Sequence, residues 1–542
     1  MSTVTKPPQP AQSSIGRSAF LVAAGIFLSR LAGLVRDRVF AHYFGNSFAA
    51  DAFRAALRIP NFLQNLFGEG VLSASFIPVY AKLVAEREDE EAGRVAGAVF
   101  SLLALVTSVL VLSGVLATPY LIDAIAPGFK GDTRLLTIQL VRVLFPGVGL
   151  LVLSAWCLGI LNSHRKFFLS YVSPVVWNIA IIVALLAFGR GATRAEGAAM
   201  TARLSRLAIY TAWGSVIGSA VQFLMQLPIV LRLVPTLHFG ITSLTGSVRT
   251  VIRNFGPVFL SRGVVQLSAY VDAFLASWLP TGAVAALSYA QTLYLLPVSL
   301  FGMSVSVAEL PAMSSALGNR EEVAATLRRR IASSTARIAF FVVPSAVGFL
   351  ALGDVIAGAI YQTGRFTHDD AVYVWAILAG SAVGLVASTV GRLYSSAYYA
   401  LRDTRTPLRF AVVRVALTTG LGYLFALPVP RALGIDLRWG VAGLTASAGF
   451  SAWIEFLLLR RGMARRIGKV ETAASYFVKL WVAAVAAAAV AWAIRIGLHP
   501  QRPIIGAVLI LVPYAAVYLG LTAMAGIGET ASLMKRLSRA RR

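Results

Sequence analysis

The sequence has few of the residues on which most soluble proteins depend. Cys157 is the only cysteine in 542 residues, so an intrachain disulfide is excluded. The five histidines are scattered along the chain and suggest no metal cluster. Only 13% of the residues are charged, against about 25% in an ordinary soluble domain. With 57% hydrophobic residues and a mean hydropathy of +0.74, most of the chain must lie in lipid.

Acidic residues are also scarce: the chain has 23 Asp and Glu compared with 49 Lys and Arg. A net charge of +26 in a soluble domain would suggest nucleic acid as the partner. Here most of the surplus lies in short loops beside apolar segments, where it indicates the positive-inside pattern and contact with anionic lipid heads. We therefore expect membrane lipids as partners and no nucleic acid.

The apolar runs are about 20 residues or longer and do not alternate with period two, which predicts an all-α integral membrane protein. Fourteen segments are predicted, with no cleaved signal peptide before them. They lie near residues 18–44, 50–81, 94–120, 135–162, 168–189, 208–232, 252–279, 281–312, 334–361, 370–400, 408–429, 438–459, 474–496 and 503–527. The loops on one side carry about 28 Lys and Arg and those on the other about 11, so both termini are expected in the cytoplasm.

Two stretches of the sequence echo each other at an offset of about 234 residues. "LFGEGVLSASFIP" from Leu66 matches "LFGMSVSVAELP" from Leu300 with one gap, and "LNSHRKFFLSYVSP" more weakly matches "YALRDTRTP". Parallel repeats are typical of transporters whose binding site lies between two lobes. We therefore expect a disordered tail at 1–17, an N-lobe of six helices at 18–233, a C-lobe of six helices at 252–461, two added helices at 474–527 and a basic tail at 528–542.

Basic residues concentrate in the first two apolar segments, namely Arg30, Arg36, Arg38, Arg54 and Arg58. If all of them faced lipid, the cost would be on the order of 10 kcal/mol or more. They must mostly face a wet cavity or one another. Internal salt bridges that only hold helices together are the alternative, but bases outnumber acids here. A basic cavity implies an anionic ligand.

The residues from Ser29 to Tyr80 resemble the start of the MurJ/MviN family. The ordered pattern S-R-x-x-G-x-x-R-D, D-A-F, [KR]-x-P-N, F-x-E-G and F-x-P is present, and "APGF", "FGPVFLS" and "DTRTP" extend the similarity over essentially the whole chain. These proteins are flippases for the lipid-linked peptidoglycan precursor lipid II, within the multidrug/oligosaccharidyl-lipid/polysaccharide exporter superfamily. The resemblance implies fourteen helices in two lobes, with residues 474–527 flanking a groove for the lipid tail.

The resemblance also implies residue roles. Arg30 and Arg36 would grip the substrate's diphosphate together with Arg58, since a planar guanidinium can bind two oxygens at once. Gating and cavity roles would fall to Asp37, Asp51, Asn61 and Glu69.

The second lobe departs from the family pattern, because a substrate-binding arginine of segment eight is missing. Ser288, Gln291 and Thr292 stand in that region. Either Arg262 or Arg392 substitutes for the missing arginine, or the first lobe holds the headgroup. Glu309 stands where the pattern is apolar and was expected to pair with one of those two bases. The C-lobe cavity candidates are therefore Arg262, Asp272, Gln291, Thr292, Glu309 and Arg392.

The predicted function is translocation of lipid II, an undecaprenyl-diphosphate-linked saccharide, from the inner to the outer leaflet of the bacterial cytoplasmic membrane by alternating access. Peptidoglycan synthesis, cell-wall biogenesis and cell shape would depend on it, and the resemblance suggests a place beside cell-wall synthases. Three alternatives stay open: a flippase for another polyprenyl-diphosphate-linked glycan such as an O-antigen or capsule unit, a cation-coupled drug exporter, and a membrane enzyme acting on lipid-linked sugars.

A transporter rather than an enzyme is expected, and no cofactor. Gly468-Lys469 is followed by Val470, so the G-x-x-x-x-G-K-[ST] motif of ATP-hydrolysing proteins is lacking. Coupling to Na⁺ or H⁺ through Asp272, Glu309 or another acid stays open. No catalytic or metal-binding residue is predicted.

Overall fold

The computed structural model describes residues 12–67, 72, 75–191, 197–240, 246–255, 270–315, 319–498 and 502–532. The chain divides into two compact units, one of residues 1–44 and 48–270 and the other of residues 45–47 and 271–542. The first unit contains α1 (Gln12–Phe44), α2 (Phe48–Phe67), α4 (Ile77–Ala85), α5 (Asp89–Ile125), α6 (Gly131–Ser163), α7 (Phe167–Phe188) and α8 (Gly197–Leu233).

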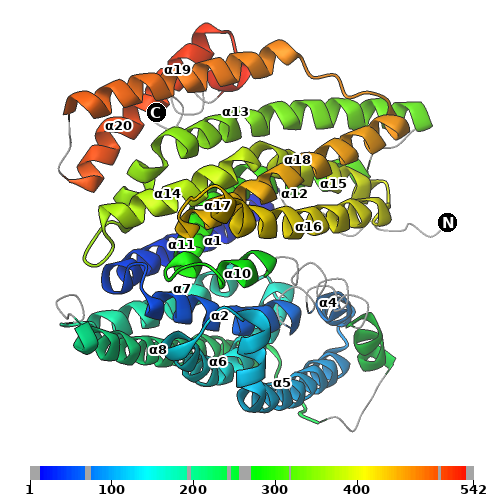
Figure 1. Cartoon of the computed structure of the whole chain (residues 1–542). Helices are drawn as coiled ribbons and strands as arrows, with labels where there is room; N and C mark the ends of the chain where they lie inside the picture. The colour runs from blue at the N-terminus through cyan, green and yellow to red at the C-terminus, as the bar shows by residue number, and fades with distance from the viewer. Residues whose placement is uncertain are drawn as a thin grey trace. The chain divides into compact units, whose positions relative to one another are not determined.

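The second unit is also helical (Figure 1). It contains α10 (Val271–Ala276), α11 (Ala283–Pro297), the π-helix η2 (Val298–Met303), α12 (Ser304–Ser314), α13 (Arg320–Tyr361), α14 (His368–Val383), α15 (Leu385–Ala400), α16 (Arg405–Ala426), α17 (Pro428–Ala432), the 3₁₀-helix η3 (Leu437–Trp439), α18 (Gly440–Ile467), α19 (Ala474–Leu498) and α20 (Pro503–Met524). The described part of the chain has no named strand, so the predicted all-α class is confirmed.

Ten helices of the described residues are long and apolar enough to cross a membrane, or eleven if α14 and α15, bent by 45° at Gly384, form one span. The predicted count of fourteen stays a prediction. α2 is not among the ten, and it carries three charged residues, Asp51, Arg54 and Arg58, within its 20 residues. Half of the predicted segment 252–279, residues 256–269, lies outside the described residues.

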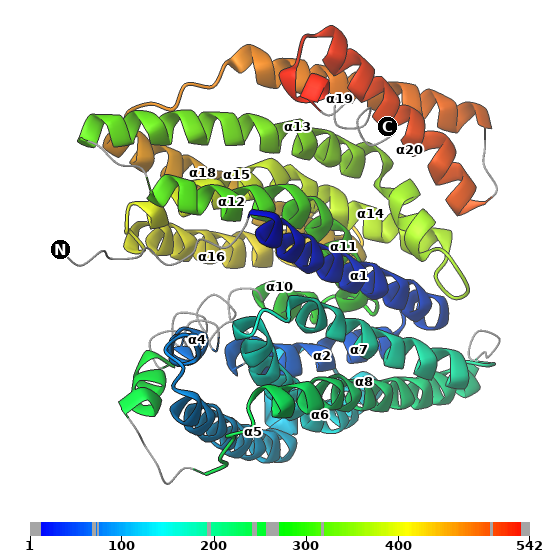
Figure 2. The same ribbon diagram turned by 180° about the vertical axis from the view of Figure 1, so that it is seen from behind.

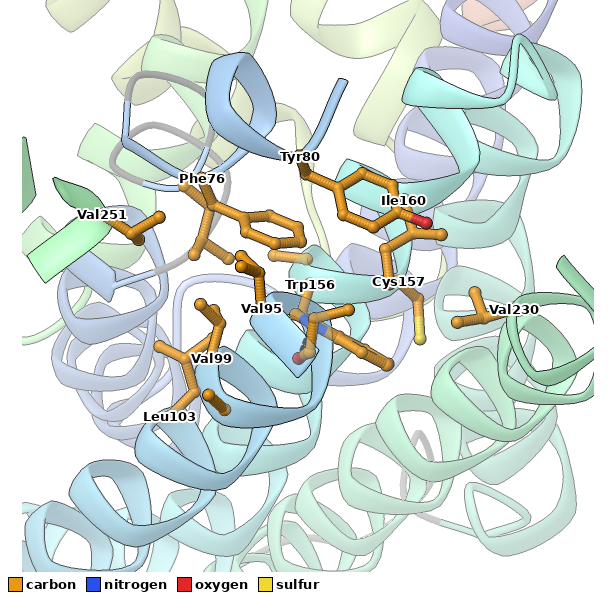
Figure 3. Close-up of a cluster of buried hydrophobic side chains, with 14 of the residues drawn as sticks. Phe76, Tyr80, Val95, Val99, Leu103, Trp156, Cys157, Ile160, Val230 and Val251 are labelled. Carbon is orange, nitrogen blue, oxygen red and sulfur yellow. Dashed lines mark hydrogen bonds between the residues drawn. The ribbon is translucent and has the colours of Figure 1, made fainter. Parts of the chain in front are cut away.

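A buried apolar cluster holds α4, α5 and α6 together in the first unit (Figure 3). Trp156 of α6 is fully buried at its centre, and its indole N–H donates to the Ala96 carbonyl of α5 at 3.1 Å. Tyr80 of α4 lies at its edge, where its hydroxyl is 3.0 Å from His164 Nε2. Burial of such large side chains contributes about 1.5–3 kcal/mol each, so this cluster anchors α4 on the rest of the unit.

In the second unit α19 and α20 pack against each other and against α13 (Figures 1 and 2). Fully or nearly fully buried alanines of α19, such as Ala484, Ala487 and Ala491, allow close packing in this cluster. The Tyr514 and Tyr518 hydroxyls of α20 donate to the Pro344 and Phe340 carbonyls of α13. Hydrogen bonds of this kind stabilise contacts between membrane helices, because the hydrophobic effect does not drive apolar helices together in lipid.

Two turns of the chain show the same backbone geometry at the positions of the weaker sequence echo. Arg165 follows α6 and Arg402 follows α15, and both have a φ of 59°. The Arg165 N–H donates to Asn162, and the Arg402 N–H donates to Tyr399. The next N–H in each turn also reaches back into the helix, which is the Schellman arrangement. Arg87 after α4 has the same geometry with a φ of 61°, so this turn is not restricted to the echo, and the repeat stays a prediction.

The "DTRTP" motif is an N-terminal cap for α16. Asp403 Oδ1 accepts hydrogen bonds from the backbone N–H groups of Arg405 and Thr406, both at 3.0 Å. Its second oxygen accepts from the Thr406 hydroxyl at 2.6 Å and forms an ion pair with Arg466. The Thr406 hydroxyl, with the Arg466 guanidinium, lowers the pKa of Asp403 to about 2.

Replacing Asp403 with alanine should therefore lower the free energy of unfolding by about 0.5–2 kcal/mol, the usual cost of losing a cap. Because the folded pKa lies below the unfolded value, the stabilisation is present above about pH 4 and is lost as pH falls towards 2. Thermal unfolding of the purified protein at pH 7 and pH 3 measures both effects. Glu471→Ala, in an exposed position of the next basic loop, should leave the melting temperature unchanged. Equal melting temperatures for Asp403→Ala and the parent protein would contradict the capping role.

Candidate functional site

A buried carboxylate on α1 holds two guanidinium groups. The Asp37 side chain is 3% exposed, and its Oδ1 accepts from Arg36 Nη2 at 2.9 Å and from Arg54 Nη2 at 3.1 Å. Arg36 Nε also donates to the same oxygen at 3.2 Å. One carboxylate is thus shared by two guanidiniums, one from α1 and one from α2.

Aromatic rings complete this cluster. The Arg36 guanidinium carbon lies 5.2 Å from the centre of the Trp177 ring on α7, and that of Arg54 lies 4.6 Å from the Phe40 ring on α1. A cation over an aromatic face gains about 0.5–2 kcal/mol, more where water is excluded. The rings therefore stabilise the two guanidiniums in addition to the carboxylate that they share.

The two guanidiniums differ little in burial. The Arg36 side chain is 19% exposed and that of Arg54 10%. Arg30, two helical turns earlier on α1, is exposed. The described residues provide no ion pair for Arg30.

The other predicted residues of the first unit lie along α2. Asp51 is buried near the start of this helix, and Arg58 is half-buried two turns later. The Tyr270 hydroxyl donates to the Arg58 carbonyl at 3.0 Å, and Asn61 is exposed. Glu69 lies outside the described residues.

The described C-lobe candidates are spread over α10, α11, α12 and α15. Asp272 lies in the first turn of α10 and is half-buried, as are Gln291 and Thr292 on α11. The Thr292 hydroxyl donates to the Ser288 carbonyl of its own helix at 3.1 Å. Arg392 on α15 is exposed, and Arg262 lies outside the described residues.

The partner expected for Glu309 was wrong. Glu309 of α12 pairs with Arg330 of α13 at 3.0 Å, rather than with Arg262 or Arg392. Arg330 belongs to a basic run that the sequence placed in a loop, but the structure begins α13 at Arg320 and so carries Arg330 on a helix beside α12. A second ion pair, between Arg414 of α16 and Glu455 of α18 at 3.1 Å, joins two further helices.

Arg54 was expected to face a cavity or another charge but was not assigned to the diphosphate site, and Trp177 was not predicted at all. The spacing of Asp51, Arg54 and Arg58 placed Arg54 on the polar stripe of α2, which was a usable signal. Trp177 stands in the apolar stretch "VVWNIA", which carries no sign of a cationic neighbour. Only the packing of α7 on α1 brings it to Arg36.

The long apolar helices of the described residues define a multi-pass helical membrane protein. The family model described as "Lipid II flippase MurJ" matches residues 40–514. The chain belongs to the lipid II flippase MurJ family.

Curated relatives support this assignment. The chain is 32% identical over 440 residues to the probable lipid II flippase MurJ of Rhizobium tropici, covering 78% of each chain. It is 29% identical over 460 residues to the lipid II flippase MurJ of Burkholderia cenocepacia, covering 83% of this chain and 84% of the relative.

Solved structures support the fold. The structure titled "Lipid II flippase MurJ, inward closed conformation" matches with a TM-score of 0.75 and 24% identity, covering 93% of this chain and 98% of that one. An inward-facing multidrug resistance MATE family transporter of the MOP superfamily matches with a TM-score of 0.63 and 18% identity, covering 82% of this chain and 98% of that one. At these identities the likeness shows the shared helical fold alone.

Proposed function

We propose that this protein translocates lipid II from the cytoplasmic to the outer leaflet of the bacterial cytoplasmic membrane, and so supplies peptidoglycan synthesis. The observation that carries the proposal is the cluster of Arg36 and Arg54 around Asp37, because guanidiniums are well suited to bind the oxygens of a diphosphate. Family membership supports lipid II as the lipid-linked substrate. No bond is made or broken in this step.

Arg30 and Arg36 are the proposed contacts of the diphosphate, with Arg58 further along the same unit. Arg36 directs Nε and Nη2 to Asp37, which leaves Nη1 for a substrate oxygen. Asp37 then acts as a positioning residue, since it fixes the fork of Arg36 before substrate arrives. A preformed fork loses less side-chain entropy when it binds an anion.

An apolar groove of about 350 Å³ runs between α13 and α20 in the second unit. Phe340, Phe349 and Tyr514 line it, together with small residues such as Gly348. Its chemistry suits an isoprenoid tail that remains in lipid while the headgroup crosses. We assign it the role of a tail groove beside α19 and α20.

The positive-inside pattern supports an orientation with both termini in the cytoplasm. An inside-negative potential favours outward movement of an anion by about 2.3 kcal/mol per charge and 100 mV, so a diphosphate can use the field without ATP. Alternating access by rocking of two lobes is the proposed mechanism. A coupling ion and a contact with cell-wall synthases stay predictions.

Depletion of a host's own lipid II flippase, with this chain supplied in its place, tests the proposal. Growth and outer-leaflet lipid II should return. Arg30→Ala and Arg36→Ala should fail at equal expression, because each removes a cation that the substrate's diphosphate would contact. Arg431→Ala, an exposed arginine of the second unit, should complement like the parent protein.

Two outcomes would reject parts of this proposal. Full growth with both Arg30→Ala and Arg36→Ala would remove the diphosphate role of these residues. Accumulation of a different glycan lipid inside cells that lack this protein would favour a flippase for an O-antigen or capsule unit, whose cavity chemistry would be nearly the same.

A further inference from the structure

Helix α15 of the second unit carries an arginine for which the proposed function has no role. Helices α12, α13 and α18 pack against α15, and nine of its 16 residues are buried, yet Arg392 is exposed. The described residues provide no carboxylate for Arg392, whereas Arg330 and Arg414 of the same unit each pair with one. An unpaired cation on a membrane helix needs a wet surface or an anionic partner.

The face of α15 that carries this arginine is polar. Between residues 387 and 399 five residues are not buried, and all of them are polar: Ser388, Arg392, Ser395, Ser396 and Tyr399. Their spacing of i, i+4, i+7, i+8 and i+11 places them on one side of the helix, which we call the polar stripe of α15. By contrast, the exposed side chains of α19 include Val478, Val482 and Val485, which suit a face that meets lipid. The polar stripe therefore faces water.

There is open space beside the middle of the polar stripe. A Cβ atom built at Gly391, next to Arg392, would meet no atom of another helix within 4 Å. The polar surface continues onto α11, because the Tyr294 hydroxyl lies 2.7 Å from the Ser388 hydroxyl. Gln291, one turn before Tyr294 on α11, is half-buried. A ligand beside α15 thus meets hydroxyl and amide groups from two helices around one guanidinium.

The length and chemistry of the polar stripe suit a glycan that carries a carboxylate. From Ser388 to Tyr399 the helix rises by about 16 Å, which is longer than a diphosphate. Serine hydroxyls both donate and accept hydrogen bonds, as sugar hydroxyls do, and Tyr399 offers an apolar ring face beside its hydroxyl. The single guanidinium of Arg392 matches one carboxylate, which it can bind through two parallel hydrogen bonds.

We propose that the polar stripe of α15 binds the saccharide and peptide part of the lipid-linked substrate, with Arg392 on a peptide carboxylate. This inference rests on the proposed translocation of lipid II, and it names the part of the headgroup that the second unit contacts. The diphosphate stays with the arginines of the first unit. The stripe then distinguishes lipid II from a polyprenyl diphosphate without a saccharide, because only lipid II provides sugar hydroxyls and a carboxylate.

Binding of two lipids to the purified full chain in detergent, measured by native mass spectrometry, tests this inference. Lipid II and undecaprenyl diphosphate share the tail and the diphosphate, but only lipid II carries the saccharide and peptide. Arg392→Ala should weaken the binding of lipid II about ten-fold, because it removes a charged hydrogen bond to the peptide. The same variant should bind undecaprenyl diphosphate like the parent protein. Arg36→Ala should weaken the binding of both lipids, since both carry the diphosphate.

A steric variant tests the open space beside Arg392. Gly391→Val places a larger side chain there without pressing on another helix, so lipid II binding should fall several-fold while the melting temperature stays unchanged. Gly420→Val on α16 is the matched control, because a Cβ atom at Gly420 also meets no other helix within 4 Å. This control should bind lipid II like the parent protein.

The outcomes separate this inference from the proposed function. Equal weakening of both lipids by Arg392→Ala, or full affinity for lipid II in both Arg392→Ala and Gly391→Val, would overturn the role of the polar stripe. A lipid-linked disaccharide without the peptide should bind Arg392→Ala and the parent protein equally, and a ten-fold difference there would refute the carboxylate contact. If the parent protein bound neither lipid, the proposed translocation would fail, and this inference with it.

Discussion

Replacing Asp37 with alanine is expected to lower the free energy of unfolding by about 3–5 kcal/mol, which is the usual cost of removing one partner of a buried ion pair. The change leaves Arg36 and Arg54 close together, with side chains only 19% and 10% exposed and without the carboxylate that they share. Two like charges in a poorly hydrated place repel each other and lose their strongest hydrogen bonds. The shift in melting temperature of the purified protein measures the effect.

A surface ion pair of the same unit provides the control for Asp37. Glu90 is 78% exposed and pairs with Arg94 at 3.1 Å, so Glu90→Ala should cost no more than about 1 kcal/mol. The double change Asp37→Ala with Arg54→Leu should recover much of the lost stability, because it removes one of the two stranded cations. A melting temperature for Asp37→Ala equal to that of Glu90→Ala would contradict the shared-carboxylate cluster.

Replacing Gly449 with valine is expected to destabilise the second unit by ~3 kcal/mol or more, since overpacking against backbone cannot be relieved by a rotamer change. A Cβ atom at Gly449 of α18 would lie 2.8 Å from the Gly384 nitrogen and 3.3 Å from the Gly380 carbonyl oxygen. Helices α14 and α18 pack closely at this point, in the manner of small residues at membrane helix crossings. The yield of folded, monodisperse protein and its melting temperature measure the loss.

Gly420 of α16 offers a matched control for this steric effect. No atom lies within 4 Å of a Cβ built at this glycine, and the residue is exposed. Gly420→Val should therefore be tolerated and gains some helix propensity. Normal folding of Gly449→Val would show that α14 and α18 are further apart than the structure has them.

Much of the functional assignment was accessible from the sequence because it depends on order along the chain. Arg30, Arg36 and Asp37 belong to one predicted helix, so their spacing in the sequence already places them within about two helical turns of one another. Apolar length likewise predicts the membrane-spanning helices, and loop charge predicts their direction. By contrast, Arg30 has no ion pair among the described residues while Arg36 does, and spacing alone could not distinguish them.

Partners from distant segments were not predictable in the same way. Glu309 pairs with Arg330 because α13 extends further towards its amino end than its apolar run, and the basic residues there become helical. Asn319 caps this extension through a hydrogen bond from the Glu322 N–H, with Glu322 reaching back to the Asn319 N–H. The capping box S/T/N-x-x-E was a readable signal for this start.

Composition and motif order by themselves determined that this chain is a helical membrane protein of a flippase family. Hydropathy, charge and motif order are properties of the sequence and do not depend on how the helices pack. Tertiary structure alone decided which charges neutralise each other, as with Arg54 and Asp37, and where α13 breaks. Pro344 is the residue that a sequence reader would choose for a kink, yet the non-helical residue is Leu352. The indole N–H groups of Trp375 and Trp492 satisfy the carbonyls exposed there, and these donors come from helices that only folding brings to α13.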